Sequence, residues 1–412
     1  MEEWKEYKLK DICIKITDGS HSSPKGLDDG YPMFSVKDMQ EYGFDYSKCK
    51  YVSYDDFLSL KQNDCVPQKG DVLVAKDGSY LKQIFVCKET RDEGILSSIA
   101  IFRPNTLVDP FFLCYLLKSP EVYNYIANNC VSGSALPRIV LKDFKEVKLR
   151  VPSLMRQKEI VSILKSLDDK IEVNRRINDN LEQQAQALFK SWFVDFEPFK
   201  KGEFVESELG MIPYGWRVGT LNELGDIVGG STPSKAKPEY YTNEGIAWLT
   251  PKDLSISQRK FTSKGEIDIT QEGYESCSTK LMPKGSVLFS SRAPIGYITI
   301  AKNDICTNQG FKSVIPKLAG TAFLYCFLKE STQEIENKAT GSTFKEASGA
   351  LMKSLPAIIP EKTVLDDFEN LLSPLFHQQE VVEEENFHLS SLRDSLLPRL
   401  MSGELKISEI NM

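Results

Sequence analysis

Asp109-Pro110-Phe111-Phe112 is the segment of this chain that comes nearest to a catalytic signature. An enzyme that methylates exocyclic amines needs an Asn/Asp-Pro-Pro-Tyr/Phe loop and a glycine-rich cofactor turn, and this segment lacks the second proline. A proline in the first turn of a helix, placed behind a capping aspartate, accounts better for the same residues. The segment therefore favours a capped helix over an active site.

Other catalytic signatures are also incomplete. The sequence contains no G-x-x-x-x-G-K-[ST] loop for ATP, and the glycine-rich residues 225–230 do not fit G-x-G-x-x-G. His21 lies among serines, where a loop histidine is commoner than the partner of a nucleophile. Three histidines without a neighbouring cluster of ligand-type residues disfavour a structural zinc site. We therefore expect a chain that binds rather than catalyses, with no cofactor or metal of its own.

Polar and basic loop residues recur at corresponding places in the two halves of the chain. Gly/Ser turns, Lys-Asp pairs and basic loops follow predicted strands in both halves. Each residue alone could be a solvated loop residue, but their recurrence suits contacts to base edges and phosphates. The candidate DNA-contacting residues are Ser20, His21, Lys37, Lys76, Ser79 and Arg138 in the first half, and Ser231, Thr232, Lys252, Arg292, Thr343 and Lys345 in the second.

The two halves are copies of one module. Trp4 precedes Leu9 by five residues, as Trp216 precedes Leu221. The further matching segments are residues 34–39 with 249–254, 69–74 with 284–289, and 112–118 with 323–329. The offset between copies stays between 208 and 215, so insertions fall in loops. A period of about 210 is too long for a solenoid and indicates a domain duplication.

Each copy predicts a mixed α/β part followed by one long helix. Short β-type runs, such as residues 71–75, 98–102 and 297–301, are separated by Gly, Pro, Asn and Asp. A helix interrupts the strands over about 110–118 and 322–329. We expect a mixed α/β (α+β) fold with two similar domains, joined by two long antiparallel helices in a coiled coil. The expected domains are residues 1–152 and 201–360 for the globular parts, 153–200 for the first long helix, and 361–412 for the second helix and the tail.

Heptad seams characterise both long helices, which are predicted over about 158–193 and 364–401. An antiparallel register in which facing residue numbers sum to about 560 would bring Ile160 to Leu400, and residues 175–176 to 384–385. The alternative is two separate amphipathic helices, each packed on its own domain. Pro374 predicts a kink or a late start in the second helix.

Charge is spread unevenly along the chain. Residues 1–152 carry 21 Lys and Arg against 22 Asp and Glu, and residues 202–360 carry 17 against 17. Residues 361–412 carry 4 against 11, a difference equal to the whole net charge of −7. Each neutral globular part can therefore turn a basic face to phosphates. The acidic cluster 383–385 is expected to be exposed and to avoid them.

The sequence also indicates the cellular compartment. The charged N-terminus and the lack of any apolar run of about 18 residues predict neither a signal peptide nor a membrane span. Nine scattered cysteines without a C-x-x-C pair predict free thiols in a reducing cytoplasm.

The whole chain resembles the specificity subunits of type I restriction-modification systems. The resemblance rests on the order of several motifs rather than on a catalytic signature. These motifs are the Trp-x(4)-Leu openings at Trp4 and Trp216, Pro152 followed by Gln157 and Glu159, LFKSWF at 188–193, GMIPYGW at 210–216 and LLPRLMSGEL at 396–405. The second copy departs from the pattern after Pro360, where it reads Glu-Lys-Thr.

The resemblance implies a DNA-binding specificity subunit without activity of its own. Each globular part would read one half of a bipartite, asymmetric double-stranded DNA site. The two helices, each about 50 Å long, would set a spacing greater than one DNA turn of about 34 Å. They would also dock two methyltransferase subunits, with restriction and motor subunits joining the complex. S-adenosylmethionine, ATP and magnesium would belong to those partners.

Two other classes of function stay open at this point. A scaffold that binds proteins would lack the steep salt dependence of DNA binding. A self-contained methyltransferase would bind S-adenosylmethionine as an isolated chain.

Overall fold

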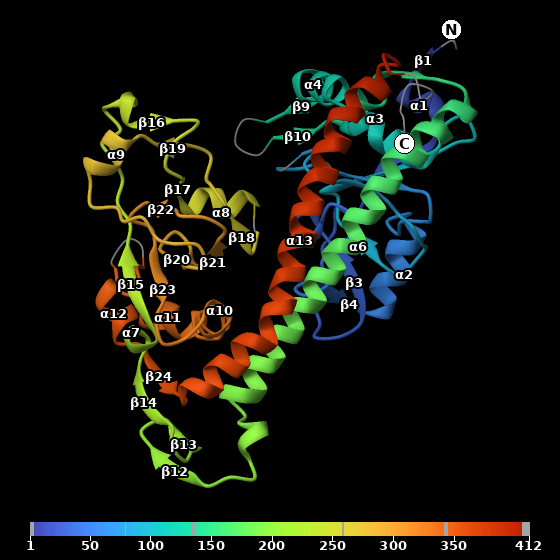
Figure 1. Ribbon diagram of the computed structural model, residues 1–412. Helices are drawn as coiled ribbons and strands as arrows, with labels where there is room; N and C mark the ends of the chain where they lie inside the picture. The colour runs from blue at the N-terminus through green and yellow to red at the C-terminus, as the bar shows by residue number, and fades with distance from the viewer. Residues whose placement is uncertain (1–3, 79, 134–136, 258, 342–344, 406–412) are drawn as a thin grey trace. The chain divides into compact units, whose positions relative to one another are not determined.

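The computed structural model describes residues 4–78, 80–133, 137–257, 259–341 and 345–405 (Figure 1). The chain folds as two compact units. Unit 1 consists of residues 1–172 and 387–412, and unit 2 of residues 173–386. Each unit therefore contains one globular part and a portion of both long helices.

Unit 1 is built on an antiparallel four-stranded sheet in the order β2-β8-β5-β6. A three-stranded sheet, β4-β3-β7, and two strand pairs, β1-β11 and β9-β10, complete its β-structure within the described residues. The strands are β1 Lys5–Lys8, β2 Cys13–Asp18, β3 Tyr31–Phe34, β4 Lys50–Val52, β5 Val72–Ala75, β6 Ile84–Val86, β7 Gly94–Ile95, β8 Ile99–Pro104, β9 Val131–Ser132, β10 Arg138–Ile139 and β11 Lys148–Val151. The helices are α1 Leu9–Ile12, η1 Val36–Asp38, α2 Tyr54–Gln62, α3 Pro110–Lys118, α4 Pro120–Asn129 and α5 Leu141–Phe144.

Helix α3 shows how local sequence builds the core of unit 1. Asp109 Oδ1 accepts hydrogen bonds from the backbone N–H groups of Phe111 at 2.9 Å and Phe112 at 3.2 Å. Pro110 occupies the first turn, where its missing N–H costs nothing. The capped helix then buries Phe112 and Leu113 in the core. The expectation of a capped helix at this segment is confirmed.

Unit 2 contains a five-stranded sheet in the order β15-β23-β20-β21-β18. The strands are β12 Phe204–Ser207, β13 Gly210–Pro213, β14 Arg217–Thr220, β15 Gly225–Gly229, β16 Tyr241–Thr242, β17 Trp248–Leu249, β18 Phe261–Thr262, β19 Asp268–Ile269, β20 Val287–Ser291, β21 Ile295–Ala301, β22 Cys306–Thr307, β23 Lys312–Pro316 and β24 Pro356–Ile359. The helices are η2 Glu197–Phe199, α7 Leu221–Leu224, η3 Pro238–Tyr240, α8 Pro251–Ser257, α9 Gln271–Glu275, α10 Thr321–Glu330, α11 Thr332–Lys338 and α12 Gly349–Lys353.

The internal duplication is visible in the strand topology. The order β2-β8-β5-β6 of unit 1 matches β15-β23-β20-β21 of unit 2, which adds β18 at the edge. A short parallel pair also recurs, as β3-β7 in unit 1 and β17-β22 in unit 2. The antiparallel pairs β1-β11 and β14-β24 close the two globular parts. The fold is therefore mixed α/β with an internal repeat, as expected.

Two helices of 40 residues follow the globular parts, α6 Leu154–Phe193 and α13 Lys362–Met401. In unit 1, Asp168 Oδ1 of α6 accepts a hydrogen bond from Arg393 Nη1 of α13 at 2.8 Å. In unit 2, Asn174 Nδ2 of α6 donates to Asn386 Oδ1 of α13 at 2.9 Å. The residue numbers of these pairs add to 561 and 560. The antiparallel register predicted from the seams is confirmed.

Of the kink or late start expected from Pro374, the late start is not observed, because α13 begins at Lys362 and continues through that proline. One further expectation about α13 is wrong. The acidic cluster 383–385 is not uniformly exposed. Glu383 is half-buried because its carboxylate accepts hydrogen bonds from the backbone N–H groups of Lys260 and Phe261. Glu384, which is exposed, pairs with Lys302.

All nine cysteines are free, and seven of them are buried. Burial raises the pKa of the Cys13 and Cys87 thiols to about 12, so these thiols stay protonated at neutral pH. Within the described ranges, no helix is both long and apolar enough to cross a bilayer.

Candidate nucleic-acid interface

The turn between β7 and β8 of unit 1, Leu96–Ser98, joins three of the candidate loops. The Ser97 N–H donates to the Ser20 carbonyl at 2.9 Å. The Val36 N–H, at the start of the helix that carries Lys37, donates to Ser98 Oγ at 3.0 Å. The Lys76 N–H donates to the Ser98 carbonyl at 2.9 Å. Segments from three distant parts of the sequence therefore meet at one turn.

The fourth candidate loop of unit 1 attaches through Lys76. The Ile139 N–H donates to the Lys76 carbonyl at 2.9 Å, and the Gly78 N–H donates to the Pro137 carbonyl at 2.8 Å. Arg138 lies between these two contacts with its side chain exposed. Ser79 lies outside the described residues. The other predicted site residues of unit 1 are thus brought into one neighbourhood.

Unit 2 repeats this construction at the turn between β22 and β23. The Ser231 N–H donates to the Thr307 carbonyl at 2.9 Å. The Asn308 N–H donates to the carbonyl of Leu249, two residues before the helix that carries Lys252, also at 2.9 Å. Residues 307–310 therefore occupy the place of Leu96–Ser98 in the second repeat.

The remaining loops of unit 2 join the same turn. The Ser291 N–H, next to Arg292, donates to the Gly310 carbonyl at 2.7 Å. The Ala347 N–H donates in turn to the Ser291 carbonyl at 2.9 Å, which brings in the loop of Lys345. Lys345 is exposed. Thr343 of this loop lies outside the described residues.

Glycine is required at one corresponding position in each repeat. A Cβ atom on Gly19 would lie 2.3 Å from the Ile95 carbonyl oxygen, and one on Gly230 would lie 2.1 Å from the Asn308 carbonyl oxygen. Both distances are far inside van der Waals contact. The end of the first sheet strand can therefore approach the turn only without a side chain.

Acidic neighbours divide the candidate cations of unit 1 into two groups. Lys76 is only 7% exposed, and its Nζ lies 3.2 Å from both Asp18 Oδ2 and Asp77 Oδ1. His21 is exposed, with Nε2 3.4 Å from Asp18 Oδ1. Lys37 and Arg138 are also exposed. The exposed side chains can reach a ligand directly, whereas Lys76 is held between carboxylates.

In unit 2, one carboxylate is shared by two cations. Arg292 Nη1 lies 3.3 Å from Glu346 Oε2, and Lys312 Nζ lies 3.2 Å from Glu346 Oε1. Two positive charges against one negative charge leave this cluster basic. Thr232 Oγ1 bonds Gln309 Oε1. Lys252 is exposed and pairs with Glu266 at 2.8 Å.

Sequence reasoning missed Lys312 and Gln309, which the fold adds to the site of unit 2. They are the first and last residues of the Gln-Gly-Phe-Lys segment, 309–312, that runs from the turn into β23. Only its position in the sequence could have indicated this segment, because it continues from the turn that binds the predicted loops. It carries no basic or glycine motif shared with the first copy, so comparison of the copies could not reveal it.

Known proteins share this organisation. The family model described as the type I restriction modification DNA specificity domain matches residues 1–183 and 213–379. The type I restriction enzyme HindI specificity subunit of Haemophilus influenzae is 27% identical over 474 residues, covering 98% of this chain and 100% of that protein. The type I restriction enzyme MjaIX specificity subunit of Methanocaldococcus jannaschii is 40% identical over 191 residues, which span 44% of each protein.

Solved structures show a similar fold. The type I restriction-modification system S subunit from M. genitalium superposes with a TM-score of 0.56 and 16% identity, over 97% of this chain and 96% of that chain. The two segments of the family match fall on the two copies of the internal duplication. The family description names DNA specificity. The chain belongs to the family of type I restriction-modification DNA specificity proteins.

Proposed function

We propose that this chain recognises a bipartite, asymmetric double-stranded DNA site, with each globular part reading one half. One observation supports this most strongly: in each unit the candidate loops gather at a single turn, but they carry different side chains. A shared frame with different polar groups suits two different sets of base edges. The recognition domains are residues 1–152 and 201–360 in this proposal.

The site residues have different roles in this proposal. The exposed cations Lys37, Arg138 and Lys345 contact phosphates or base edges, together with the Arg292 and Lys312 pair. Lys76 positions its loop between Asp18 and Asp77 rather than touching DNA. The hydroxyl groups contact DNA and also stabilise their own turns. Ser20 Oγ, for example, donates to the Ser22 carbonyl at 2.8 Å. His21, Ser231, Thr232 and Lys252 complete the set of proposed DNA contacts.

The long helices have a second task in the proposal. Residues 153–200 and 361–412 fix the spacing of the two half-sites and dock two methyltransferase subunits. Restriction and motor subunits then complete an assembly that works on cytoplasmic DNA. S-adenosylmethionine, ATP and magnesium are bound by those subunits rather than by this chain.

Methylome sequencing tests the division of labour between the globular parts. A host would express this chain together with its methyltransferase subunits. Replacing residues 1–150 with the first domain of another member of the family should change one half of the methylated sequence and leave the other half unchanged. A change in both halves would contradict independent reading by the two domains.

Point variants sharpen the same experiment. Arg138→Ala should relax or weaken recognition of one half-site, and Arg292→Ala should do so for the other. The matched controls are Lys142→Ala and Lys353→Ala, which remove exposed cations of the short helices α5 and α12. If the controls change the methylated sequence as much as the site variants, the assignment of the turns is wrong.

A further inference from the structure

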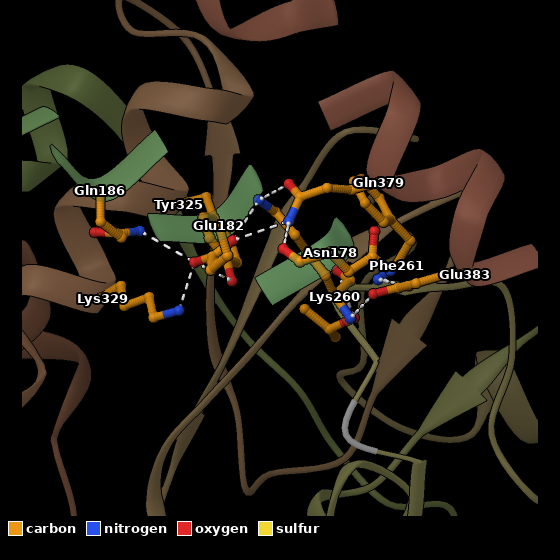
Figure 2. Close-up of polar contacts among 10 residues, drawn as sticks. Asn178, Glu182, Gln186, Lys260, Phe261, Tyr325, Lys329, Gln379 and Glu383 are labelled. Carbon is orange, nitrogen blue, oxygen red and sulfur yellow. Dashed lines mark hydrogen bonds and ion pairs between the residues drawn. The ribbon is translucent and has the colours of Figure 1, made fainter. Parts of the chain in front are cut away.

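Lys260 of unit 2 lies among polar side chains that include Glu182 and Gln379 (Figure 2). It lies just before β18, and its side chain is 6% exposed. Its Nζ lies 2.8 Å from Glu182 Oε2 of α6 and 2.6 Å from Gln379 Oε1 of α13. A residue of the globular part thus reaches both long helices at once.

Two aromatic rings complete the surroundings of the Lys260 ammonium. Its Nζ lies 3.4 Å from the ring centroid of Phe376 on α13 and 4.2 Å from that of Tyr325 on α10. Both distances fall well inside the range of cation–π attraction. The Tyr325 hydroxyl donates to Glu182 Oε1 at 3.2 Å. The rings therefore bind the lysine and orient its carboxylate partner.

The helices also hold the backbone at this position. Glu383 Oε1 accepts from the Lys260 N–H at 2.9 Å, and Glu383 Oε2 accepts from the Phe261 N–H at 3.1 Å. The contact therefore involves both the main chain and the side chain of Lys260. We name this cluster of Glu182, Lys260, Tyr325, Gln379 and Glu383 the second anchor.

The second anchor keeps the Glu182 carboxylate ionised. Burial lowers the pKa of Lys260, and the Glu182 charge opposes that shift. Burial acts to raise the pKa of Glu182, but the charges of Lys260 and Lys329 outweigh it and lower that pKa to about 2. A buried lysine without such a partner would lose its hydration without compensation. Lys260 therefore occupies this buried position only because the Glu182 carboxylate lies beside it.

Unit 1 has a corresponding cluster around Asp168. This carboxylate accepts hydrogen bonds from Tyr42 at 2.9 Å, Tyr115 at 2.7 Å and Arg393 at 2.8 Å. Arg393 Nη1 also pairs with Glu41 Oε1 at 2.8 Å. We name Glu41, Tyr42, Tyr115, Asp168 and Arg393 the first anchor.

The two anchors correspond in the repeat. The shift of 208 residues that relates Pro152 to Pro360 also relates Asp168 to Phe376. Each anchor takes a tyrosine from the helix that interrupts the strands, α3 or α10. In each, the segment after the Lys-Asp pair supplies the residue that contacts the long helices.

The ion pair that links a globular part to the long helices has the opposite sense in the two anchors. In the first anchor the cation, Arg393 of α13, meets both Asp168 of α6 and Glu41 of the globular part. In the second anchor the cation, Lys260, comes from the globular part and meets Glu182 of a long helix. A further pair beside the first anchor, Lys88 with Glu172, runs in the same sense as the second anchor. The reversal therefore concerns the Arg393–Glu41 and Lys260–Glu182 pairs rather than every ion pair at the anchors.

We propose that Lys260 is the residue that docks the second globular part onto its segment of the long helices, and that the reversed ion pairs make each globular part specific for its own segment. A globular part that placed Glu41 against the acidic residues of the second anchor would bring carboxylates together without a cation. The proposal concerns assembly of the chain and does not depend on the DNA contacts proposed above.

Hydrogen exchange on the full chain tests the role of Lys260. The readout is the protection of the Phe261 amide, which bonds Glu383, and of the Ile300 amide, which bonds the Lys260 carbonyl. Lys260→Arg should retain protection, Lys260→Met should reduce it, and Lys260→Glu should reduce it by a further factor of about ten. Equal protection in the Met and Glu variants would overturn the proposal, because packing alone would then explain the residue.

The Lys252–Glu266 pair supplies the matched control. Its N–O distance is also 2.8 Å, but both side chains are 68% exposed. Lys252→Met and Lys252→Glu should change the protection of neighbouring amides by less than about twofold each.

Exchanging the two charges tests directly whether the sense of the ion pair matters. The double variant Lys260→Glu with Glu182→Lys should regain protection relative to Lys260→Glu alone. If the two substitutions are merely additive, the anchor is not specific for charge. Should the Glu variant fail to fold, the milder Lys260→Met and Glu182→Gln pair gives the same answer through its double-mutant cycle. A coupling no larger than that of the Lys252–Glu266 control would overturn the proposal.

Discussion

Arg393 on α13 donates a 2.8 Å hydrogen bond to Asp168 on α6, and the same carboxylate also accepts from two tyrosine hydroxyls. The side chains of Arg393 and Asp168 are only 15% and 10% exposed. Removing one partner of such a pair leaves the other charge buried and uncompensated. The pair is therefore a point at which unit 1 should be sensitive to substitution.

Arg393→Met should destabilise unit 1 by about 3 kcal/mol, because it leaves the buried Asp168 carboxylate without the Arg393 guanidinium. Urea unfolding, followed by a probe in residues 1–172, measures the change. Lys142→Met, at an exposed lysine of the same unit, should cost less than about 1 kcal/mol. A loss of similar size in both variants would show that the Arg393 network contributes no more than a surface residue.

The stability of unit 2 should depend on pH through Glu182. Its pKa is lowered from 4.5 to about 2, so the folded state binds this proton less readily than the unfolded state. The stabilisation is thus fully present above pH 4.5 and is lost as the pH falls towards 2. Unfolding of the wild type and of Glu182→Gln, compared between these pH values, isolates the contribution. The advantage of the wild type should shrink steadily with acidification, and an advantage independent of pH would contradict this assignment.

Gly19→Ala and Gly230→Ala should each disrupt one candidate interface. Their Cβ atoms would lie 2.3 Å and 2.1 Å from backbone carbonyl oxygens, which cannot move as a flexible side chain can. Each variant should impair methylation specified by one half-site while the globular core stays folded. Gly43→Ala is the control, since no atom lies within 4 Å of its Cβ position. Normal methylation in both site variants would mean that the turns do not position the DNA contacts.

The basic cluster of unit 2 should contribute to the salt dependence of DNA binding. If Arg292 and Lys312 each contact a phosphate, their alanine variants should each lower the slope of log K against log salt by about 1. Fluorescence anisotropy with the assembled complex over a range of salt concentrations gives these slopes. Lys353→Ala should leave the slope unchanged, and an unaltered slope in the cluster variants would exclude phosphate contacts by these residues.

Periodicity predicted the long helices and their register because heptad spacing is a local property that any antiparallel partner must match. The strands were predicted from short β-type runs such as residues 71–75, which contain β5. The late start that Pro374 suggested is not observed. A proline removes one helical hydrogen bond, and the packing of Phe368, Leu372 and Phe376 in the core of unit 2 outweighs that loss.

The burial of particular charged residues could not be predicted from the sequence. Lys260 and Glu383 resemble solvated surface residues in the sequence, and only their tertiary partners show that they are buried or half-buried. Lys76 was a candidate DNA contact in the sequence, and its two carboxylate neighbours, Asp18 and Asp77, come from separate positions along the chain. The convergence of the loops on one turn depends on hydrogen bonds between distant backbones, which leave no pattern in a single sequence.

The turns at Leu96–Ser98 and residues 307–310 hold their loops mainly through main-chain hydrogen bonds. A backbone contact does not depend on the identity of the side chain beside it. Exposed positions such as Lys37, Arg138 and Lys345 are thus permissive sites for a combinatorial library, whereas Gly19 and Gly230 are not. Under the proposed function, selection from such a library should redesign one half of the recognised sequence while the rest of the chain stays unaltered.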